Sequence, residues 1–196
     1  SNVGILARTG NIEGKNTVIN NCGQAAFAGS YGGSYDFTHC TFANYWASST
    51  QTCIILDDYI ETETGEQIEA LTSANFKNCI IYGSSNLGLS LKKRGTVFEY
   101  NFDHCLIKFA DYSNQFANNT LYQFSVNPRF VNCLIATNST VNKPFFRDAT
   151  KNDLIIGEDS AAKGTANNTY STFNDILNNS RSGATDIGAY NWITFE

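Results

Sequence analysis

A short motif built around cysteine recurs along this chain and constrains its fold more than any other feature. It reads apolar, any residue, Asn or His, Cys, any residue, apolar. Good copies run over residues 37–42, 76–81, 102–107 and 130–135, and a weaker copy runs over 19–22. The cysteines of these copies are Cys22, Cys40, Cys79, Cys105 and Cys133, whereas Cys53 lies outside the pattern. A repeat of about 18 to 28 residues is typical of a solenoid, in which stacked units bury a shared core.

The residue before each motif cysteine predicts a sharp bend between two short strands. Strict alternation along one strand would bury Lys77 with Cys79, and burying an unpaired ammonium is costly. Asn and His tolerate the left-handed αL conformation, and a bend there lets Phe76, Cys79 and Ile81 point inward while Lys77 and Ile80 point outward. The predicted corner residues are Asn21, His39, Asn78, His104 and Asn132. We therefore interpret the two histidines as corner residues and not as catalytic bases.

The repeated Asn-Cys step at this spacing resembles the right-handed parallel β-helix of the pectate-lyase type, over roughly residues 1–150. In that family Asn residues stack at a tight corner, and Phe, Cys and Ile stack inside. The resemblance implies an all-β fold, a right-handed parallel β-helix (solenoid). Equivalent residues of stacked coils lie about 4.8 Å apart, and parallel Cβ vectors at that distance exceed the usual disulfide separation. We therefore expect the motif cysteines to be free, buried thiols.

The end of the chain is expected to form a separate covering segment. The run Asp186-Ile187-Gly188-Ala189-Tyr190 resembles the C-terminal, choice-of-anchor-like segment of surface β-helix proteins of Bacteroidetes. This resemblance implies a secreted or bacterial cell-surface protein. We expect coils over residues 1–150 and a capping segment over 151–196, packed on the last coils so that it blocks their open edge.

Composition and charge exclude some partners. The formal net charge is −5, with a sequence pI near 5.0, and a chain without a basic stripe is a poor ligand for nucleic acid. No stretch approaches about 18 apolar residues, so we expect no membrane insertion by this chain. The chain has no Met and opens without a signal-peptide pattern. We therefore expect a truncated, C-terminal portion of a longer protein. We also expect the chain to be a monomer.

One functional hypothesis is an enzyme acting on acidic polysaccharide, a lyase or a glycoside hydrolase, as the resemblance implies. Elimination needs a base and neutralisation of the substrate carboxylate, often by Ca²⁺ on Asp and Glu side chains. The candidates for a metal or acidic site are Asp57, Asp58, Glu61 and Glu63, and those for the base are Lys92, Lys93 and Arg94. The alternative interpretation is that both groups are solvated charges on loops. We expect no other cofactor, because no CxxC pair or zinc-finger spacing occurs.

A second hypothesis is a module that binds polysaccharide through exposed aromatic rings and amides. The candidate carbohydrate-binding residues are Tyr45, Trp46, Tyr82, Tyr112 and Tyr122. A third hypothesis is a structural stalk of a larger adhesin, with no ligand within these residues. An enzyme predicts acidic residues beside Lys or Arg in a groove, a binding module predicts an exposed aromatic row at strand spacing, and a stalk predicts neither.

Overall fold

The computed structural model of this chain describes residues 1–47 and 50–196 and is built mainly from three parallel β-sheets. The first sheet contains β1 (Val3–Arg8), β4 (Ala25–Ser30), β7 (Thr52–Asp57) and β12 (Leu89–Lys92). The second contains β2 (Asn11–Lys15), β5 (Gly33–Thr38), β10 (Leu71–Lys77), β13 (Asn101–Asp103) and β15 (Phe130–Val131). The third contains β3 (Val18–Ile19), β6 (Thr41–Asn44), β11 (Ile80–Gly83), β14 (Leu106–Lys108) and β16 (Leu134–Ala136).

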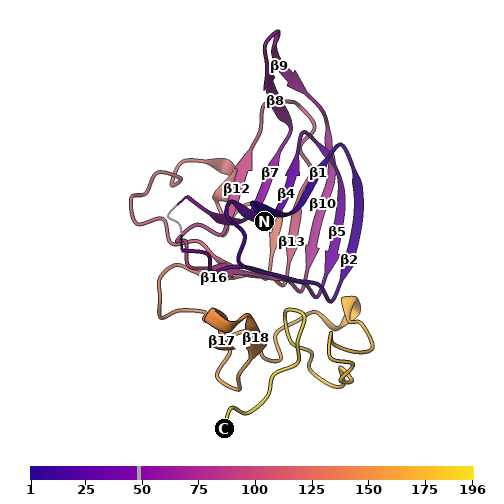
Figure 1. The fold of residues 1–196 in the computed structure, drawn as a ribbon, viewed down its shortest axis with the longest axis vertical. Coiled ribbons are helices and arrows are strands. Elements are labelled where there is room, and N and C mark those ends of the chain that lie inside the picture. Colours follow the sequence, from indigo (N-terminus) through magenta and orange to yellow (C-terminus); the bar gives the residue numbers. More distant parts are fainter. Residues whose placement is uncertain (48–49) are drawn as a thin grey trace.

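The chain visits these sheets in the same order each time, first, second and then third. We call one such passage a circuit. Neighbouring strands of a sheet therefore come from successive circuits and pair in parallel. Figure 1 shows the second sheet as a row in which β2, β5, β10 and β13 follow one another in chain order.

A left-handed residue stands at every corner between the second and third sheets. The backbone φ is 46° at Asn16, 51° at His39, 53° at Asn78, 49° at His104 and 49° at Asn132. Four of these residues, His39, Asn78, His104 and Asn132, are predicted by the motif. The prediction for Asn21 is wrong, because Asn21 has a positive φ of 55° but follows β3 of the third sheet, and Asn16 forms the corner of the first circuit. Because Asn and His reach this region at lower cost than most residues, the same bend recurs and the strands on both sides stay in register.

Rows of equivalent side chains fill the interior. Phe37, Phe76, Phe102 and Phe130 form one row, with centroid distances of 5.5, 4.9 and 5.3 Å between successive, nearly parallel rings. The cysteines are all free; Cys133, in the last circuit, is partly exposed, and the other five are buried. The aromatic row at strand spacing thus lies inside the molecule and contributes to the core.

The segment after β16 covers the outer face of the third sheet. It contains the antiparallel pair β17 (Phe146–Asp148) and β18 (Asp153–Ile156), and the short 3₁₀ turns η2 (Ala149–Lys151) and η3 (Asn168–Tyr170). The β17–β18 pair spans residue 150, so the boundary expected there falls within one hairpin. Ile156, Ala162 and Ile187 from this segment pack against Ile80 and Leu106. Ile80 points outward as predicted, yet it is only 1% exposed, because this segment covers it.

The contacts of this segment extend along the stack and are not confined to the last coils. Arg181 Nη2 lies 3.4 Å from Asn16 Oδ1 in the first circuit, and Ala189 N donates to Thr41 Oγ1 (3.1 Å) in the second. Gly188 N donates to the backbone oxygen of Asn78, 2.8 Å away, in the third. Figure 1 shows the segment running beneath the sheets, in orange and yellow. The expectation of a cap on the last coils is therefore corrected to a strap across several circuits.

Two excursions interrupt the circuits. Strands β8 (Tyr59–Thr62) and β9 (Gly65–Ile68) form an antiparallel hairpin that projects at the top of Figure 1. By contrast, residues 84–95 contain β12 of the first sheet and therefore belong to the fourth circuit. Residues 109–129 form a loop with the 3₁₀ turn η1 (Thr120–Tyr122), where the fifth circuit has no strand in the first sheet. Within the described residues, no helix combines the length and the apolar character needed to cross a membrane.

Candidate functional site

The outer face of the first sheet presents residues in straight rows across the strands. Leu6 pairs with Ala28, Ala28 with Ile55, and Ile55 with Ser90. In a second row Arg8 pairs with Ser30, and Asp57 pairs with Lys92. Successive members of a row are about 4.8 Å apart, the spacing of paired strands. The face therefore offers a repeating surface along the direction in which the circuits stack.

Three cavities lie along this face and meet at Lys92. The first, of about 420 Å³, is lined by Leu6 and Arg8 among others. The second, of about 370 Å³, shares Gln24 and Ile55 with the first. The third has a volume of about 700 Å³ and lies beside Tyr59. Lys92 is the one residue that lines all three. We call this row of cavities the first-sheet groove.

Positive charge gathers at the β12 end of the groove. Lys92, Lys93 and Arg94 are exposed and line the third cavity. The guanidinium of Arg94 stacks 4.8 Å from the centroid of the Tyr59 ring, and its Nε lies 3.1 Å from Glu66 Oε1. The hydrogen bond to Glu66 raises the pKa of Arg94. Lys92 and Lys93 form no salt bridge within the described residues, and both line a cavity of about 700 Å³, which is large enough for a small anionic group.

A buried carboxylate holds the basic run in place. Asp58, between β7 and β8, is fully buried. Its Oδ1 accepts a hydrogen bond from Arg94 N (2.8 Å), and its Oδ2 accepts one from Gly95 N (2.9 Å). Because such charge-assisted bonds are among the strong ones, Asp58 fixes the loop that carries the three cations. The acidic and basic runs of the sequence are thus brought together.

Asp57 lies on the groove face opposite Lys92. Its Oδ1 accepts from Tyr31 N (2.9 Å), and its Oδ2 accepts from Ser30 Oγ (3.1 Å). Burial raises the pKa of Asp57, partly offset by these hydrogen bonds and by the charge of Lys92. Asp57 and Asp58 are neighbours in sequence but face opposite ways, so they do not form one acidic pair.

The other two predicted acids lie on the projecting hairpin. Glu61 pairs with Glu66 across β8 and β9, and Glu63 lies in the turn; all three are exposed. Across residues 1–47 and 50–196, no three His, Cys, Asp or Glu side chains lie together so that they could hold a metal ion. The predicted calcium site from Asp57, Asp58, Glu61 and Glu63 is therefore not assembled in these residues.

The predicted carbohydrate-binding aromatics do not form one surface. Trp46 and Tyr112 are 52% and 66% exposed. Tyr45 is partly buried against Phe146. The expectation that Tyr82 and Tyr122 are exposed is corrected, because they are only 7% and 6% exposed. Tyr82 packs in the contact between the third sheet and the C-terminal segment, and Tyr122 packs in the core.

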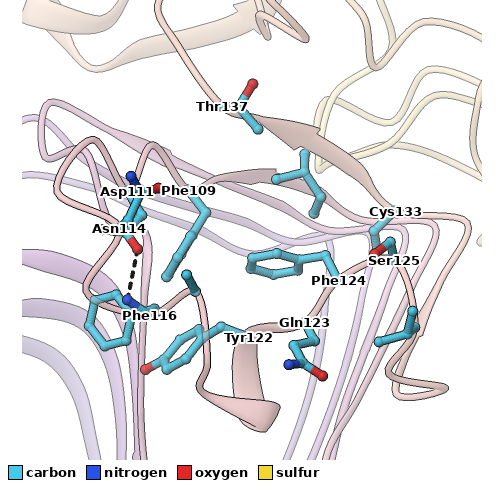
Figure 2. A pocket seen from close by; sticks show the side chains of 13 residues that line it. Phe109, Asp111, Asn114, Phe116, Tyr122, Gln123, Phe124, Ser125, Cys133 and Thr137 are labelled. Carbon is cyan, nitrogen blue, oxygen red and sulfur yellow. Dashed lines mark hydrogen bonds between the residues drawn. The ribbon is translucent and has the colours of Figure 1, made fainter.

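A cavity of about 780 Å³ lined by aromatic side chains lies between the loop of residues 109–129 and the last circuit. Figure 2 shows the rings of Phe109, Phe116, Tyr122 and Phe124 turned toward one another. Asp111 organises the loop around them, since its Oδ2 accepts a hydrogen bond from Phe116 N (2.8 Å). Phe116 and Tyr122 also line the second cavity of the first-sheet groove, so these rings form the wall between the two spaces.

Of the residues that line the groove, the sequence singled out the basic run, Asp57 and Tyr122, but not the others. Arg8, Gln24 and Ile55 line it, and none of them belongs to a recognisable motif. Only the spacing of outward-pointing residues along each strand marks them, and this signal cannot be used until the register between strands is known.

Comparisons with family models, with curated proteins and with solved structures find no match for this chain.

Proposed function

We propose that this chain is a right-handed parallel β-helix that binds an acidic polysaccharide along its first-sheet groove, as a secreted or surface-exposed module. The fold proposal is supported by the constant order in which the circuits visit three parallel sheets and by the left-handed corners. The resemblance of the corner motif to β-helices of the pectate-lyase type supports it from the sequence. The resemblance of residues 186–190 to surface β-helix proteins supports the location.

The observation that carries the binding proposal is the position of Lys92 at the junction of three cavities. A linear polymer along the groove follows rows with a spacing of about 4.8 Å. Hydroxyl and amide side chains such as Ser90 and Gln24 can bond sugar hydroxyls, and the small side chain of Ala28 leaves space above the sheet. Lys92 and Lys93 would pair with carboxylates of the polymer, because ammonium–carboxylate hydrogen bonds are stronger than neutral ones.

Affinity electrophoresis in gels containing polygalacturonate tests this proposal. The double variant Lys92→Gln/Lys93→Gln should bind roughly tenfold more weakly than the unchanged protein. Lys151→Gln is the matched control, because Lys151 is a highly exposed lysine of the C-terminal segment. Binding should also weaken as salt is raised, since exposed charges are screened. Equal retardation of both variants, or no retardation of the unchanged protein by any uronate polymer, would contradict the proposal.

A lyase is the second candidate, because Asp57 lies opposite Lys92 in the groove and acidic residues beside a basic group are what an eliminating enzyme needs. Absorbance at 235 nm during incubation with uronate polysaccharides, with and without Ca²⁺, reports the unsaturated product. A rise that disappears in Lys92→Gln would make the module an enzyme. No rise, together with gel retardation, would leave binding as its activity.

A further inference from the structure

A second cleft lies on a different face, between the second sheet and the C-terminal segment. It has a volume of about 590 Å³. Its floor comes from β2, β5 and β10, and its wall from residues 170–173. The lining residues are Glu13, Lys15, Asp36, Thr38, Lys77, Tyr170, Ser171, Thr172 and Phe173. None of them lines the first-sheet groove, so the two spaces are separate.

The charges in this cleft are paired with one another. Lys77 Nζ lies 2.6 Å from Asp36 Oδ2, and Lys15 Nζ lies 2.8 Å from Glu13 Oε1. The Lys77–Asp36 pair is partly buried, with side chains 25% and 37% exposed. Two cations and two anions leave the lining without net charge. The cleft therefore offers many hydrogen-bond donors and acceptors but little attraction for an ion, in contrast to the Lys92 end of the groove.

A buried carboxylate of the second sheet holds the Tyr170 side of the cleft in place. Asp103 is 8% exposed, and its Oδ2 accepts a hydrogen bond from the Tyr170 hydroxyl at 2.8 Å. Its Oδ1 lies 2.5 Å from His104 Nδ1. The ammonium of Lys77 lies 5.7 Å from the centroid of the Tyr170 ring. Because a buried carboxylate holds Tyr170 onto the sheet, the wall is set before any ligand binds, which lowers the cost of binding.

Phe173 stands on this wall with its ring in solvent. It is 94% exposed, the largest value among the exposed apolar residues of the described chain. Its backbone is nevertheless held, because Arg181 N donates to its carbonyl oxygen at 2.9 Å. No ring contact involves Phe173 within the described residues. An exposed aromatic face beside paired polar groups has the two properties that a sugar ring needs, an apolar surface for its C–H groups and partners for its hydroxyls.

We propose that this cleft binds a neutral saccharide residue, with the sugar ring on Phe173 and its hydroxyls bonded to Lys77 and Asp36. This site is distinct from the acidic-polysaccharide groove, and its ligand differs from that of the groove in carrying no charge. The proposal does not depend on binding in the groove. A chain with both sites could hold a charged and an uncharged glycan at once.

The test is affinity electrophoresis of the full chain in gels with galactomannan, hydroxyethylcellulose or dextran as neutral polymers, and polygalacturonate as the acidic one. We expect at least one neutral polymer to retard the protein. Phe173→Ala should weaken that retardation about tenfold or more, and it leaves the fold intact because the ring is exposed. Lys92→Gln/Lys93→Gln should leave it unchanged. Retardation by the neutral polymer should persist between low and high salt, because a ligand without charge is not screened.

Tyr112→Ala is the matched control, since Tyr112 is also an exposed aromatic residue but lies on the loop that follows β14. It should bind the neutral polymer as tightly as the unchanged protein. The proposal is overturned if no neutral polymer retards the protein, if Phe173→Ala is retarded as strongly as the unchanged protein, or if Tyr112→Ala alone loses binding. If the unchanged protein is retarded by a neutral polymer but not by polygalacturonate, only the proposal for the first-sheet groove is contradicted.

Discussion

The side-chain nitrogen of Asn78 lies 3.0 Å from Nε2 of His39, the equivalent corner residue one circuit earlier. Asn78 Nδ2 also donates to the backbone oxygen of Asn167 (2.9 Å), and its Oδ1 accepts from Asn167 N (2.8 Å). The corner row therefore does more than bend the chain. At Asn78 it joins two circuits to each other and to the C-terminal segment.

Asn78→Ala should cost more stability than Asn132→Ala. Both residues have positive φ, where alanine is strained by about 1 kcal/mol. Asn78 also forms the bonds to Asn167, and its loss leaves those partly buried polar groups unpaired, at a cost of up to roughly 1–3 kcal/mol. Asn132 is exposed. Urea denaturation measures both changes. Asn78→Gly separates the causes, because glycine removes the strain but not the loss of the amide. Equal destabilisation by Asn78→Ala and Asn132→Ala would contradict the role of the amide.

Stability should fall as the solution becomes acidic, and His39 should contribute to the fall. Its ring is fully buried, and its Nδ1 lies 3.3 Å from the carbonyl oxygen of Gly188. That contact assigns the proton of the neutral ring to Nδ1 and leaves Nε2 to accept from Asn78. Burial, assisted by the charge of Arg181, lowers the pKa of His39 from 6.5 to about 3.

The unfolded chain therefore binds more protons than the folded one between about pH 3 and 6.5. The contribution of His39 is fully present above pH 6.5 and is lost as the pH falls, by at most about 1.4 kcal/mol per pH unit. His39→Asn suits the corner and removes the titration. Urea midpoints of both proteins at pH 4, 5.5 and 7 should converge as the pH falls, relative to their difference at pH 7. A constant difference across this range would show that His39 does not titrate on unfolding.

Most corners and the free thiols could be predicted from the sequence because they follow local rules. An Asn or His before Cys occurs at four of the five corners, and the tolerance of these residues for positive φ is a property of single residues. The corner of the first circuit could not be identified by this rule, because Asn16 precedes Thr17 and not a cysteine. The burial of Tyr82 could not be predicted in this way. It depends on the C-terminal segment, whose residues in the same hydrophobic cluster begin at Phe146, more than 60 residues after Tyr82 in the sequence. The groove likewise depends on which strands become neighbours, and the outward residues Leu6, Ala28 and Ile55 come from three separate circuits.

Tyr122→Phe should lower stability and weaken glycan binding only to the extent that it loosens β12, although Tyr122 is a candidate sugar-binding residue from the sequence. Its hydroxyl accepts from Leu91 N (2.5 Å) and donates to the carbonyl oxygen of Leu91 (3.2 Å), so it ends the first sheet in place of another strand. Removing the hydroxyl leaves these groups of β12 unpaired, at a cost of about 1–3 kcal/mol. Thermal denaturation and gel retardation measure the two effects. Weaker binding without a change in melting temperature would instead make Tyr122 a ligand contact.

Asp58→Ala should weaken binding of polygalacturonate although Asp58 lines none of the three groove cavities. Its carboxylate bonds the backbone N–H groups of Arg94 and Gly95, and without it the loop that carries Lys92 and Lys93 is no longer fixed. The loss of two charge-assisted bonds should cost about 2–4 kcal/mol of stability. Asp58→Asn keeps one acceptor oxygen and should show an intermediate loss of both stability and affinity. This variant provides the test if the alanine variant does not fold. Glu61→Ala, an exposed change on the hairpin, should alter neither. If Asp58→Asn loses stability but binds as tightly as the unchanged protein, the position of the basic loop does not set the affinity of the groove.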